Sequence, residues 1–169
     1  MRGLRPAEYH KSIFEIDLDK LRRMGKRAIM LDLDNTLVRW NDPTPTPALL
    51  SWLAEARAHG LQPCIVSNNR GARVREFASR AGVPFIGRAG KPRVKGFAEA
   101  MQRLGVTPDE TVVVGDQIFT DVLGGNRAGA YTILVVPIDR REFIGTRLVR
   151  IIERRVLSYL QRRGLLTEK

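Results

Sequence analysis

Two aspartates at the end of an apolar run are the residues of this sequence best suited to chemistry. Residues 28–31 read Ala-Ile-Met-Leu and are followed by Asp32, Leu33 and Asp34. The run is typical of a buried strand, and because side chains alternate along a strand, Asp32 and Asp34 share one side. In open α/β sheets, ligands bind beyond the carboxyl ends of the strands. Two acids there repel each other unless a cation or a shared proton lies between them, which predicts a metal-assisted catalytic site.

Further polar residues follow the other predicted strands. The pattern predicts strands at 62–66, 83–86, 111–114 and 132–136, and helices at 47–59, 70–81 and 94–104. Strands that alternate with helices imply a parallel sheet with right-handed crossovers, so the carboxyl ends of the strands share one edge. The polar residues expected at that edge are Asp32, Asp34, Ser67, Lys91, Asp116 and Asp121.

This set of residue types suits phosphoryl transfer. Three carboxylates can hold Mg²⁺, which prefers oxygen ligands. The hydroxyl of Ser67 and the ammonium of Lys91 suit a tetrahedral oxyanion, and the metal would neutralise developing phosphoryl charge. A carboxylate nucleophile can accept a phosphoryl group as an acyl phosphate and so divide one difficult displacement into two easier ones.

The order and spacing of these residues resemble the four motifs of the haloacid dehalogenase (HAD) superfamily. The matching segments are Asp32-Leu-Asp34-Asn-Thr36, Ser67, Lys91 and Gly115-Asp116-Gln-Ile-Phe-Thr-Asp121. Longer stretches at 66–69, 115–117 and 120–129 resemble the YqeG group of subclass IIIA, which is related to phosphatidylglycerophosphate phosphatases. The two carboxylates of the first motif indicate the phosphatase branch. The resemblance implies a three-layer Rossmann-like α/β fold, with a five-stranded, mostly parallel sheet in the order 3-2-1-4-5.

The resemblance also implies roles for the acidic residues. Asp32 would be the nucleophile and a Mg²⁺ ligand. Asp34 would be the general acid and base, and its backbone carbonyl would bind the metal. Asp116 would be a direct metal ligand, whereas Asp121 would act through a metal-bound water or through Lys91. Taken alone, Asp121 could instead cap the helix that follows it.

The remaining predicted site residues would bind phosphate. Ser67 and Lys91 would contact the phosphoryl oxygens, as the resemblance implies. Asn68 could also donate to phosphate, although Asn68 and Asn69 are equally typical of a turn.

Four residues near or outside the motifs have weaker interpretations. Arg39 and Trp40 follow the first motif, where they would either contact substrate or pack within the loop. His10 and His59 lie outside the motifs and are expected to be solvated or capping, since positive charge is favoured near a helix C-terminus.

We expect one domain over residues 1–169: a lead-in (1–27), a catalytic core (28–138) and a basic amphipathic C-terminal helix (139–169). Ile13, Phe14 and Ile16 are expected to hold the lead-in against the body. The intervals 38–61 and 68–90 are too short for the cap domain that HAD enzymes often carry. The site should therefore be open to a phosphate presented by a lipid headgroup, a nucleic acid or a protein.

The positive charge lies mainly at the two ends of the chain. The net charge is +11, of which residues 1–31 supply +4 and residues 139–169 supply +5. Over residues 146–163 apolar residues recur at helical spacing among arginines, which is typical of a helix that lies on an anionic bilayer. Alternatively, the apolar stripe packs on the sheet and the arginines are solvated. RNA could use the same charge, but the tail has few aromatic residues for stacking.

The composition indicates a cytoplasmic protein. A single cysteine, Cys64, excludes an intramolecular disulfide and fits a reducing compartment. No signal peptide or membrane-spanning run is recognisable, so any membrane association would be peripheral, on the inner face.

The sequence thus predicts a Mg²⁺-dependent phosphomonoester hydrolase, with phosphatidylglycerophosphate as the favoured substrate. One alternative is a phosphatase of a soluble sugar, nucleotide or protein phosphate. Another is an RNA- or ribosome-associated factor in which the HAD site is secondary.

Overall fold

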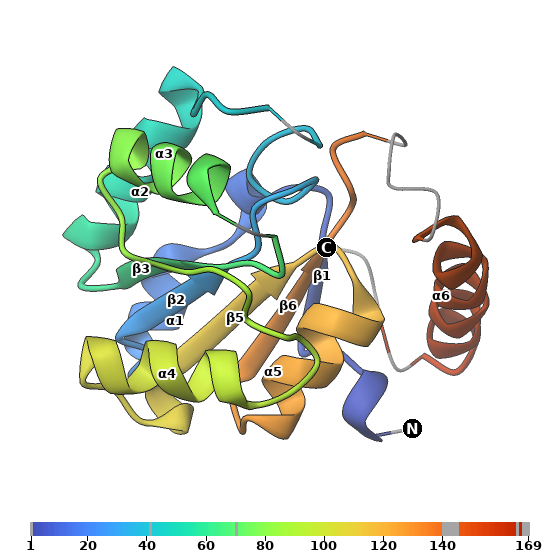
Figure 1. Cartoon of the computed structure of the whole chain (residues 1–169). Coiled ribbons are helices and arrows are strands. Elements are labelled where there is room, and N and C mark those ends of the chain that lie inside the picture. The colour runs from blue at the N-terminus through green and yellow to red at the C-terminus, as the bar shows by residue number, and fades with distance from the viewer. Residues whose placement is uncertain (1, 41, 70, 140–145, 165, 167–169) are drawn as a thin grey trace.

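The computed structural model describes residues 2–40, 42–69, 71–139, 146–164 and 166, without the side chains of residues 2, 146–151 and 154. Its centre is a parallel sheet in the order β1-β6-β5-β2-β3-β4 (Figure 1). The strands are β1 (Glu8–His10), β2 (Ala28–Leu31), β3 (Gln62–Val66), β4 (Phe85–Ile86), β5 (Thr111–Gly115) and β6 (Tyr131–Val135). The predicted α/β class and the order of the five predicted strands are confirmed, but the predicted number of strands was one too few.

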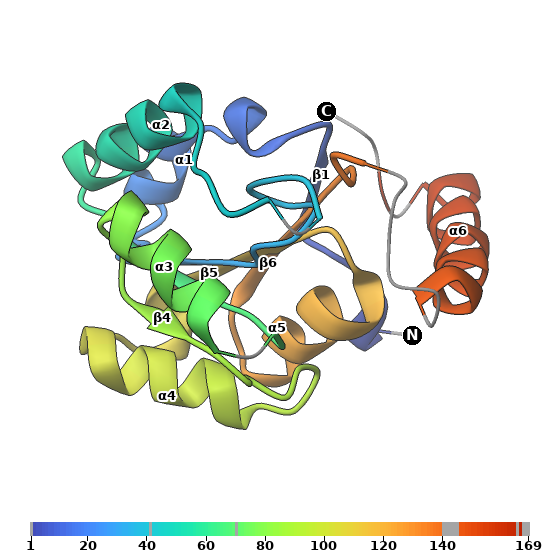
Figure 2. The same ribbon diagram turned by 45° about the horizontal axis from the view of Figure 1, so that its top comes forward.

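Helices cover both faces of the sheet. The α-helices are α1 (Leu18–Arg23), α2 (Pro47–Ala58), α3 (Ala72–Ala81), α4 (Lys95–Leu104), α5 (Leu123–Arg127) and α6 (Thr146–Arg162). Short turns of helix are η1 (Arg2–Leu4), η2 (Ile13–Glu15), η3 (Pro108–Glu110) and the π-helical η4 (Ile118–Val122). Figure 2 shows α1 and α2 on one side of the sheet and α4 and α5 on the other.

The core follows from alternation along the buried strands. In β2, Ile29 and Leu31 pack on the side of α1, α2 and α3, whereas Ala28 and Met30 pack on the side of α4. Cys64 is buried on the α4 side, and burial raises the pKa of its thiol to about 12. This alternation determines toward which face of the sheet each side chain points at the end of β2, where the candidate site begins.

The additional strand, β1, comes from the lead-in, where no strand was predicted. Glu8 to His10 pairs in parallel with Ile133 to Val135 of β6. His10 is 4% exposed, so the prediction that it is solvated or capping was wrong. Ile13 and Ile16 are buried as predicted, but Phe14 is 54% exposed and does not hold the lead-in.

A buried carboxylate explains how this short polar strand is stabilised. The Glu8 Oε1 atom accepts hydrogen bonds from Lys20 Nζ (2.8 Å) and the Tyr131 hydroxyl (2.7 Å), and Oε2 lies 2.8 Å from His10 Nε2. Burial alone would raise the pKa of Glu8. The hydrogen bonds from Lys20, Tyr131 and His10 outweigh it and lower that pKa to about 2.

This network predicts a pH-dependent contribution to stability. The pKa of Glu8 is lower in the folded chain than the ordinary 4.5, so its contribution is fully present above about pH 5 and is lost as pH falls toward 2. Glu8→Gln should lower the free energy of unfolding by at most about 3 kcal/mol at pH 7, and by less than half of that at about pH 3. Urea unfolding at both pH values would measure this. The exposed Glu99→Gln should change stability by no more than about 0.5 kcal/mol at either pH, and equal losses from Glu8→Gln at both would contradict the interpretation.

The C-terminal helix packs against the β1–β6 side of the molecule (Figure 1). Val156 and Leu157 lie against Ile118, Val122 and Leu134, and Leu160 is 2% exposed. Exposed side chains of this helix include Ile152, Arg155 and Arg162. The side chains of the predicted stripe residues Leu148 and Val149, and of Arg147, Arg150 and Arg154, lie outside the described part of the structure. Where it is described, the helix packs Val156, Leu157 and Leu160 on the body and exposes Ile152 and two arginines to solvent.

Two further features of the fold concern access to the site. Between β2 and β3 the described chain holds one loop and α2, and between β3 and β4 it holds only α3, so neither predicted insertion point carries a cap domain. Among the helices described, none is both long enough and apolar enough to cross a bilayer.

Candidate active site

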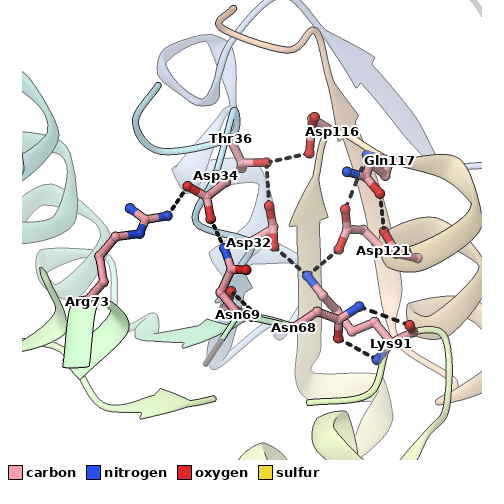
Figure 3. A network of polar contacts seen from close by, with 12 residues as sticks. Asp32, Asp34, Thr36, Asn68, Asn69, Arg73, Lys91, Asp116, Gln117 and Asp121 are labelled. Carbon is pink, nitrogen blue, oxygen red and sulfur yellow. Dashed lines mark hydrogen bonds and ion pairs between the residues drawn. The ribbon is translucent and has the colours of Figure 1, made fainter. Parts of the chain in front are cut away.

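The carboxyl ends of the central strands bring the predicted site residues together (Figure 3). Asp32 directly follows β2, and its backbone N–H bonds the carbonyl of Val114 in β5. The chain then turns back tightly: Asn35 has a φ of 62°, and its N–H bonds the Val38 carbonyl. Asparagine tolerates this left-handed conformation better than most residues do, which explains its place after Asp34.

Lys91 lies at the centre of the site. Its Nζ atom is 2.5 Å from Asp32 Oδ1 and 2.6 Å from Asp121 Oδ1, and its side chain is 3% exposed. Burial lowers the pKa of Lys91, but the carboxylates of Asp121 and Asp32 outweigh this effect and raise it. The lysine is therefore a fixed positive charge next to the predicted nucleophile.

The surroundings of Asp32 partly disfavour the ionised form of its carboxyl group. Burial raises its pKa to about 6, with Asp121 and Asp34 adding to the rise and Lys91 opposing it. The Thr36 hydroxyl lies 3.4 Å from Asp32 Oδ2 and 3.2 Å from Asp116 Oδ1. Sequence reasoning included Thr36 in the first motif without giving it a role, and the structure places its hydroxyl between two of the acids.

Three carboxylates form a cluster that could hold a cation. Oxygen atoms of Asp32, Asp116 and Asp121 all lie within 4.8 Å of one another, and Asp116 and Asp121 are buried. Buried carboxylates with hard oxygen donors fit Mg²⁺ and do not favour a softer ion. The carboxylate of Asp121 therefore lies nearer to the candidate metal site than its predicted indirect role requires. Asp121 also makes the predicted contact with Lys91.

The side chain of Asp34 points away from this cluster, toward α3 (Figure 3). Its carboxylate forms an ion pair with Arg73 and accepts a hydrogen bond from the Asn69 side chain. Arg73 also donates to the Asp42 carbonyl at 3.0 Å, which ties α3 to the loop after β2. Sequence reasoning gave Arg73 no role and interpreted Asn69 as a turn residue, because neither partner can be inferred from local spacing.

The predicted phosphate-binding residues lie on the same side of the pocket. Ser67 is buried, and its Oγ accepts the backbone N–H of Asn69 at 3.1 Å. The Asn68 side chain donates to the Lys91 carbonyl (3.1 Å) and accepts from the Lys91 N–H (2.7 Å). Asn68 thus holds the backbone that carries Lys91, and its contact with phosphate stays a prediction.

Asp121 reaches the site because a glycine lets it approach the end of β5. The Asp121 side chain does not cap the next helix, since Oδ2 accepts the Gln117 N–H at 3.2 Å and Oδ1 bonds Lys91. A Cβ atom on Gly115 would lie 2.2 Å from Asp121 Cγ, a distance that no side chain can tolerate. A residue without a side chain is therefore required before Asp116.

Gly115→Ala should displace the Asp121 carboxylate and break its ion pair with Lys91. We expect a loss of stability of about 1–3 kcal/mol and at least a tenfold loss of turnover. Urea unfolding and phosphate release would measure the two effects. Gly87→Ala is the matched control, because its Cβ would meet the Asn69 carbonyl at an ordinary 3.6 Å. A Gly115→Ala variant as active as the wild-type chain would contradict the argument.

The C-terminal helix contacts the segment that carries Asp121. Glu153 of α6 is 2% exposed, and its Oε1 accepts the N–H of Phe119 at 3.2 Å. Phe119 lies near the start of η4, where backbone N–H groups have no partner within the helix. Sequence reasoning treated Glu153 only as part of the tail, although an acid among many arginines was a visible signal.

A shallow pocket opens above Asp32 and Lys91. Asp34, Ser67 and Asn69 also line it, and its outer wall includes Trp40, which is 44% exposed. Arg39 is also exposed, outside this set of lining residues. The sequence left two interpretations open for Trp40, and the structure places it at the mouth of the pocket.

Comparison with known proteins identifies the family. A family model described as haloacid dehalogenase-like hydrolase matches residues 7–129. The chain belongs to the haloacid dehalogenase-like hydrolases. The HAD resemblance seen in the four motifs is confirmed, as is the prediction that the chain is an enzyme of the hydrolase class.

Two relatives of this HAD chain are named as phosphatases. It is 46% identical over 159 residues to the probable phosphatase YqeG of Bacillus subtilis, covering 94% of this chain and 92% of that protein. It is 31% identical over 170 residues to the phosphatidylglycerophosphate phosphatase 1 of Arabidopsis thaliana, covering 92% of this chain but only 47% of that protein. The predicted likeness to the YqeG group is confirmed, and the likeness to the plant enzyme is more distant.

A solved HAD structure shares the fold. The cobalt-bound deoxy-D-mannose-octulosonate 8-phosphate phosphatase of Haemophilus influenzae aligns with a TM-score of 0.54 at 15% identity, covering 66% of this chain and 69% of that one. This likeness supports the fold of the HAD chain and carries no information about its substrate.

Proposed function

We propose that this chain is a Mg²⁺-dependent phosphomonoester hydrolase that acts through an aspartyl phosphate on Asp32, with the phosphate of phosphatidylglycerophosphate as its favoured substrate. The observation that carries the proposal is the position of Asp32. Its carboxylate lies 2.5 Å from a buried lysine, within an acidic cluster, at the base of an open pocket.

The geometry supports a two-step transfer. An Asp32 oxygen attacks phosphorus and the bond to the leaving oxygen breaks, while the carboxyl group of Asp34 gives that oxygen a proton. Water then attacks phosphorus while Asp34 takes a proton from the water, the bond between phosphorus and the Asp32 oxygen breaks, and inorganic phosphate leaves with the Asp32 carboxylate restored. Lys91 and Ser67 stabilise the charge on the phosphoryl oxygens in both steps. Arg73 and Asn69 hold the Asp34 side chain at the side of the pocket.

The residues present fit a divalent cation. Asp32 and Asp116 would supply carboxylate oxygens to it, and the backbone carbonyl of Asp34 and the carboxylate of Asp121 would be further candidate ligands. When bound, Mg²⁺ would polarise the phosphoryl group and reduce the repulsion between the substrate and the clustered acids. The buried positions of Asp116 and Asp121 close to Asp32 support this assignment, because clustered carboxylates repel one another and a divalent cation between them reduces that repulsion.

Three features favour a lipid substrate over a small soluble one. No cap domain covers the pocket in the described chain, so a phosphate held at a surface can reach Asp32. The net charge is +11, and each base near an anionic bilayer contributes roughly 1 kcal/mol of attraction. The plant relative is named as a phosphatidylglycerophosphate phosphatase.

A phosphate-release panel tests the proposal. The full chain would be assayed with phosphatidylglycerophosphate in vesicles and with a nucleotide, a sugar phosphate and a phosphopeptide in solution. We expect release from the lipid that requires Mg²⁺ and stops with a chelator. Good turnover of a soluble phosphate without release from the lipid would remove the lipid assignment, and release that is unaffected by chelation would remove the metal.

A further inference from the structure

Exposed apolar side chains gather at the edge of the sheet where the pocket opens. In the part of the chain that the structure describes, seven large apolar side chains are exposed. Four of them lie in segments that follow the carboxyl end of a strand, namely Phe14 after β1, Trp40 after β2, Val94 after β4 and Ile138 after β6. Because all six strands are parallel, these segments emerge at the same edge of the sheet as Asp32.

Hydrogen bonds place the segments after β1, β2 and β6 next to one another. The Ile138 N–H bonds the carbonyl of Asn35, so the segment after β6 lies beside the first motif. The Val136 N–H bonds the carbonyl of His10, which brings the segment that carries Phe14 alongside. Trp40 lines the pocket itself, and Figure 1 shows the loops after β2 and β6 side by side beyond the ends of the strands.

Exposed bases accompany these apolar side chains. Arg39 precedes Trp40, Arg93 and Lys95 flank Val94, and Lys11 lies three residues before Phe14. The two exposed acids near Phe14 are engaged with backbone: Glu15 accepts the N–H of Lys11, and Asp17 accepts the N–H of Lys20. Single exposed apolar residues are ordinary on protein surfaces, but apolar residues interleaved with bases around a pocket are typical of surfaces that bind anionic interfaces.

We infer that this edge is the surface by which the chain docks on an anionic lipid bilayer. The docking surface is defined by Phe14, Trp40, Val94 and Ile138 with the bases beside them. Docked in this way, the apolar side chains enter the headgroup region, the bases contact lipid phosphates, and the pocket faces the bilayer. The site is thereby brought to a headgroup phosphate without a cap domain. The inference rests on the proposed lipid substrate and goes beyond it by assigning the contact to the site edge and not to α6.

Vesicle binding by the full chain, measured in the presence of a chelator so that no turnover occurs, tests this assignment. Anionic phosphatidylglycerol vesicles containing a spin-labelled lipid should quench Trp40, while neutral phosphatidylcholine vesicles should not. Trp52, the other tryptophan, is 5% exposed in the core and should not respond. Phe14→Ser/Ile138→Ser should weaken flotation with anionic vesicles by roughly tenfold or more. The same variant should retain hydrolysis of a soluble phosphate, because neither side chain belongs to the site.

Two controls separate the site edge from the tail. Met24→Ser removes an exposed apolar side chain at the end of α1, at the opposite edge of the sheet, where β2 begins, and should bind vesicles like the wild-type chain. Arg155→Glu/Arg162→Glu reverses two exposed charges of α6 and should leave quenching of Trp40 by saturating vesicles intact.

Three results would overturn the inference: no binding to anionic vesicles, binding without quenching of Trp40, or loss of binding only in the α6 variant. Binding with the expected quenching but without lipid phosphate release would support the docking surface and refute the proposed substrate. The docking surface and the proposed substrate can therefore be refuted independently of each other.

Discussion

Asp32→Asn is expected to abolish turnover, lowering kcat by roughly 10⁴-fold or more. An amide has nearly the shape of the carboxylate and can still accept a hydrogen bond from Lys91, which lies 2.5 Å from Asp32 Oδ1. It cannot form an acyl phosphate, because its nitrogen and oxygen are too weakly nucleophilic. Lys91, Ser67 and the metal would still bind phosphate, so substrate affinity should change much less than kcat.

The same variant should be more stable than the wild-type chain when metal is absent. Burial raises the pKa of Asp32 to about 6, so its ionisation at neutral pH opposes folding. For an acid whose pKa is raised by folding, the destabilisation appears above the unfolded value near 3.8 and is complete above about pH 6. We expect Asp32→Asn to gain on the order of 1 kcal/mol at pH 7 in chelator, and to lose that gain at about pH 4.

Single-turnover phosphate release and urea unfolding would measure the two effects. The matched control is Asp109→Asn, an exposed aspartate at the opposite edge of the sheet, which should alter neither quantity appreciably. An Asp32→Asn variant that retained turnover would end the nucleophile assignment. A variant that lost activity together with stability would show instead that Asp32 acts mainly in folding.

The sequence was sufficient for the central sheet and for the residues at its edge because both depend on local signals. Each central strand is an apolar run, and Asp32, Ser67 and Asp116 come directly after such runs. The parallel order of the strands then brings these side chains to one place with no further information. The strand ends therefore predicted the acidic cluster and its lysine.

The residues that were missed depend on partners far away in the chain. β1 has three residues, all with ionisable side chains, and its burial depends on Lys20 and Tyr131, which no local pattern connects to Glu8. The ion pair between Asp34 and Arg73 joins residues 39 positions apart, the first just after β2 and the second in α3. Such pairs follow from the tertiary packing of helices and loops, which spacing along a strand does not encode.

Lys91→Met is the second variant with a large expected effect, because Lys91 compensates two carboxylates at once. Its ammonium lies 2.5 Å from Asp32 and 2.6 Å from Asp121, and its side chain is 3% exposed. Removing one partner of a buried ion pair costs about 3–5 kcal/mol, because the remaining charge is left uncompensated. Loss of the positive charge beside the phosphoryl group should also lower kcat by roughly 10²- to 10³-fold.

Lys95→Met is the matched control, since this lysine lies four residues later, is exposed at the start of α4 and should tolerate the change within about 0.5 kcal/mol. Unfolding in urea and the rate of phosphate release from a soluble phosphate ester would be compared for both variants, because Lys95 lies on the proposed docking surface and its loss could alter release from vesicles. A Lys91→Met variant as stable as Lys95→Met would mean that the two carboxylates do not depend on the lysine for compensation.

The double variant Lys91→Met/Asp121→Asn separates the two roles of the lysine. If Lys91 stabilises the fold by compensating Asp121, neutralising that carboxylate should restore about 1 kcal/mol or more of the lost stability, and the two effects should not add. Turnover should not recover, because the charge beside the phosphoryl group is still missing. Recovery of stability without recovery of activity would show that one ammonium serves both the packing of η4 against β5 and the chemistry at Asp32. If the losses of stability from the two substitutions add, Asp121 does not depend on Lys91 for charge compensation. Asp32 is then the only one of the two carboxylates whose charge Lys91 balances.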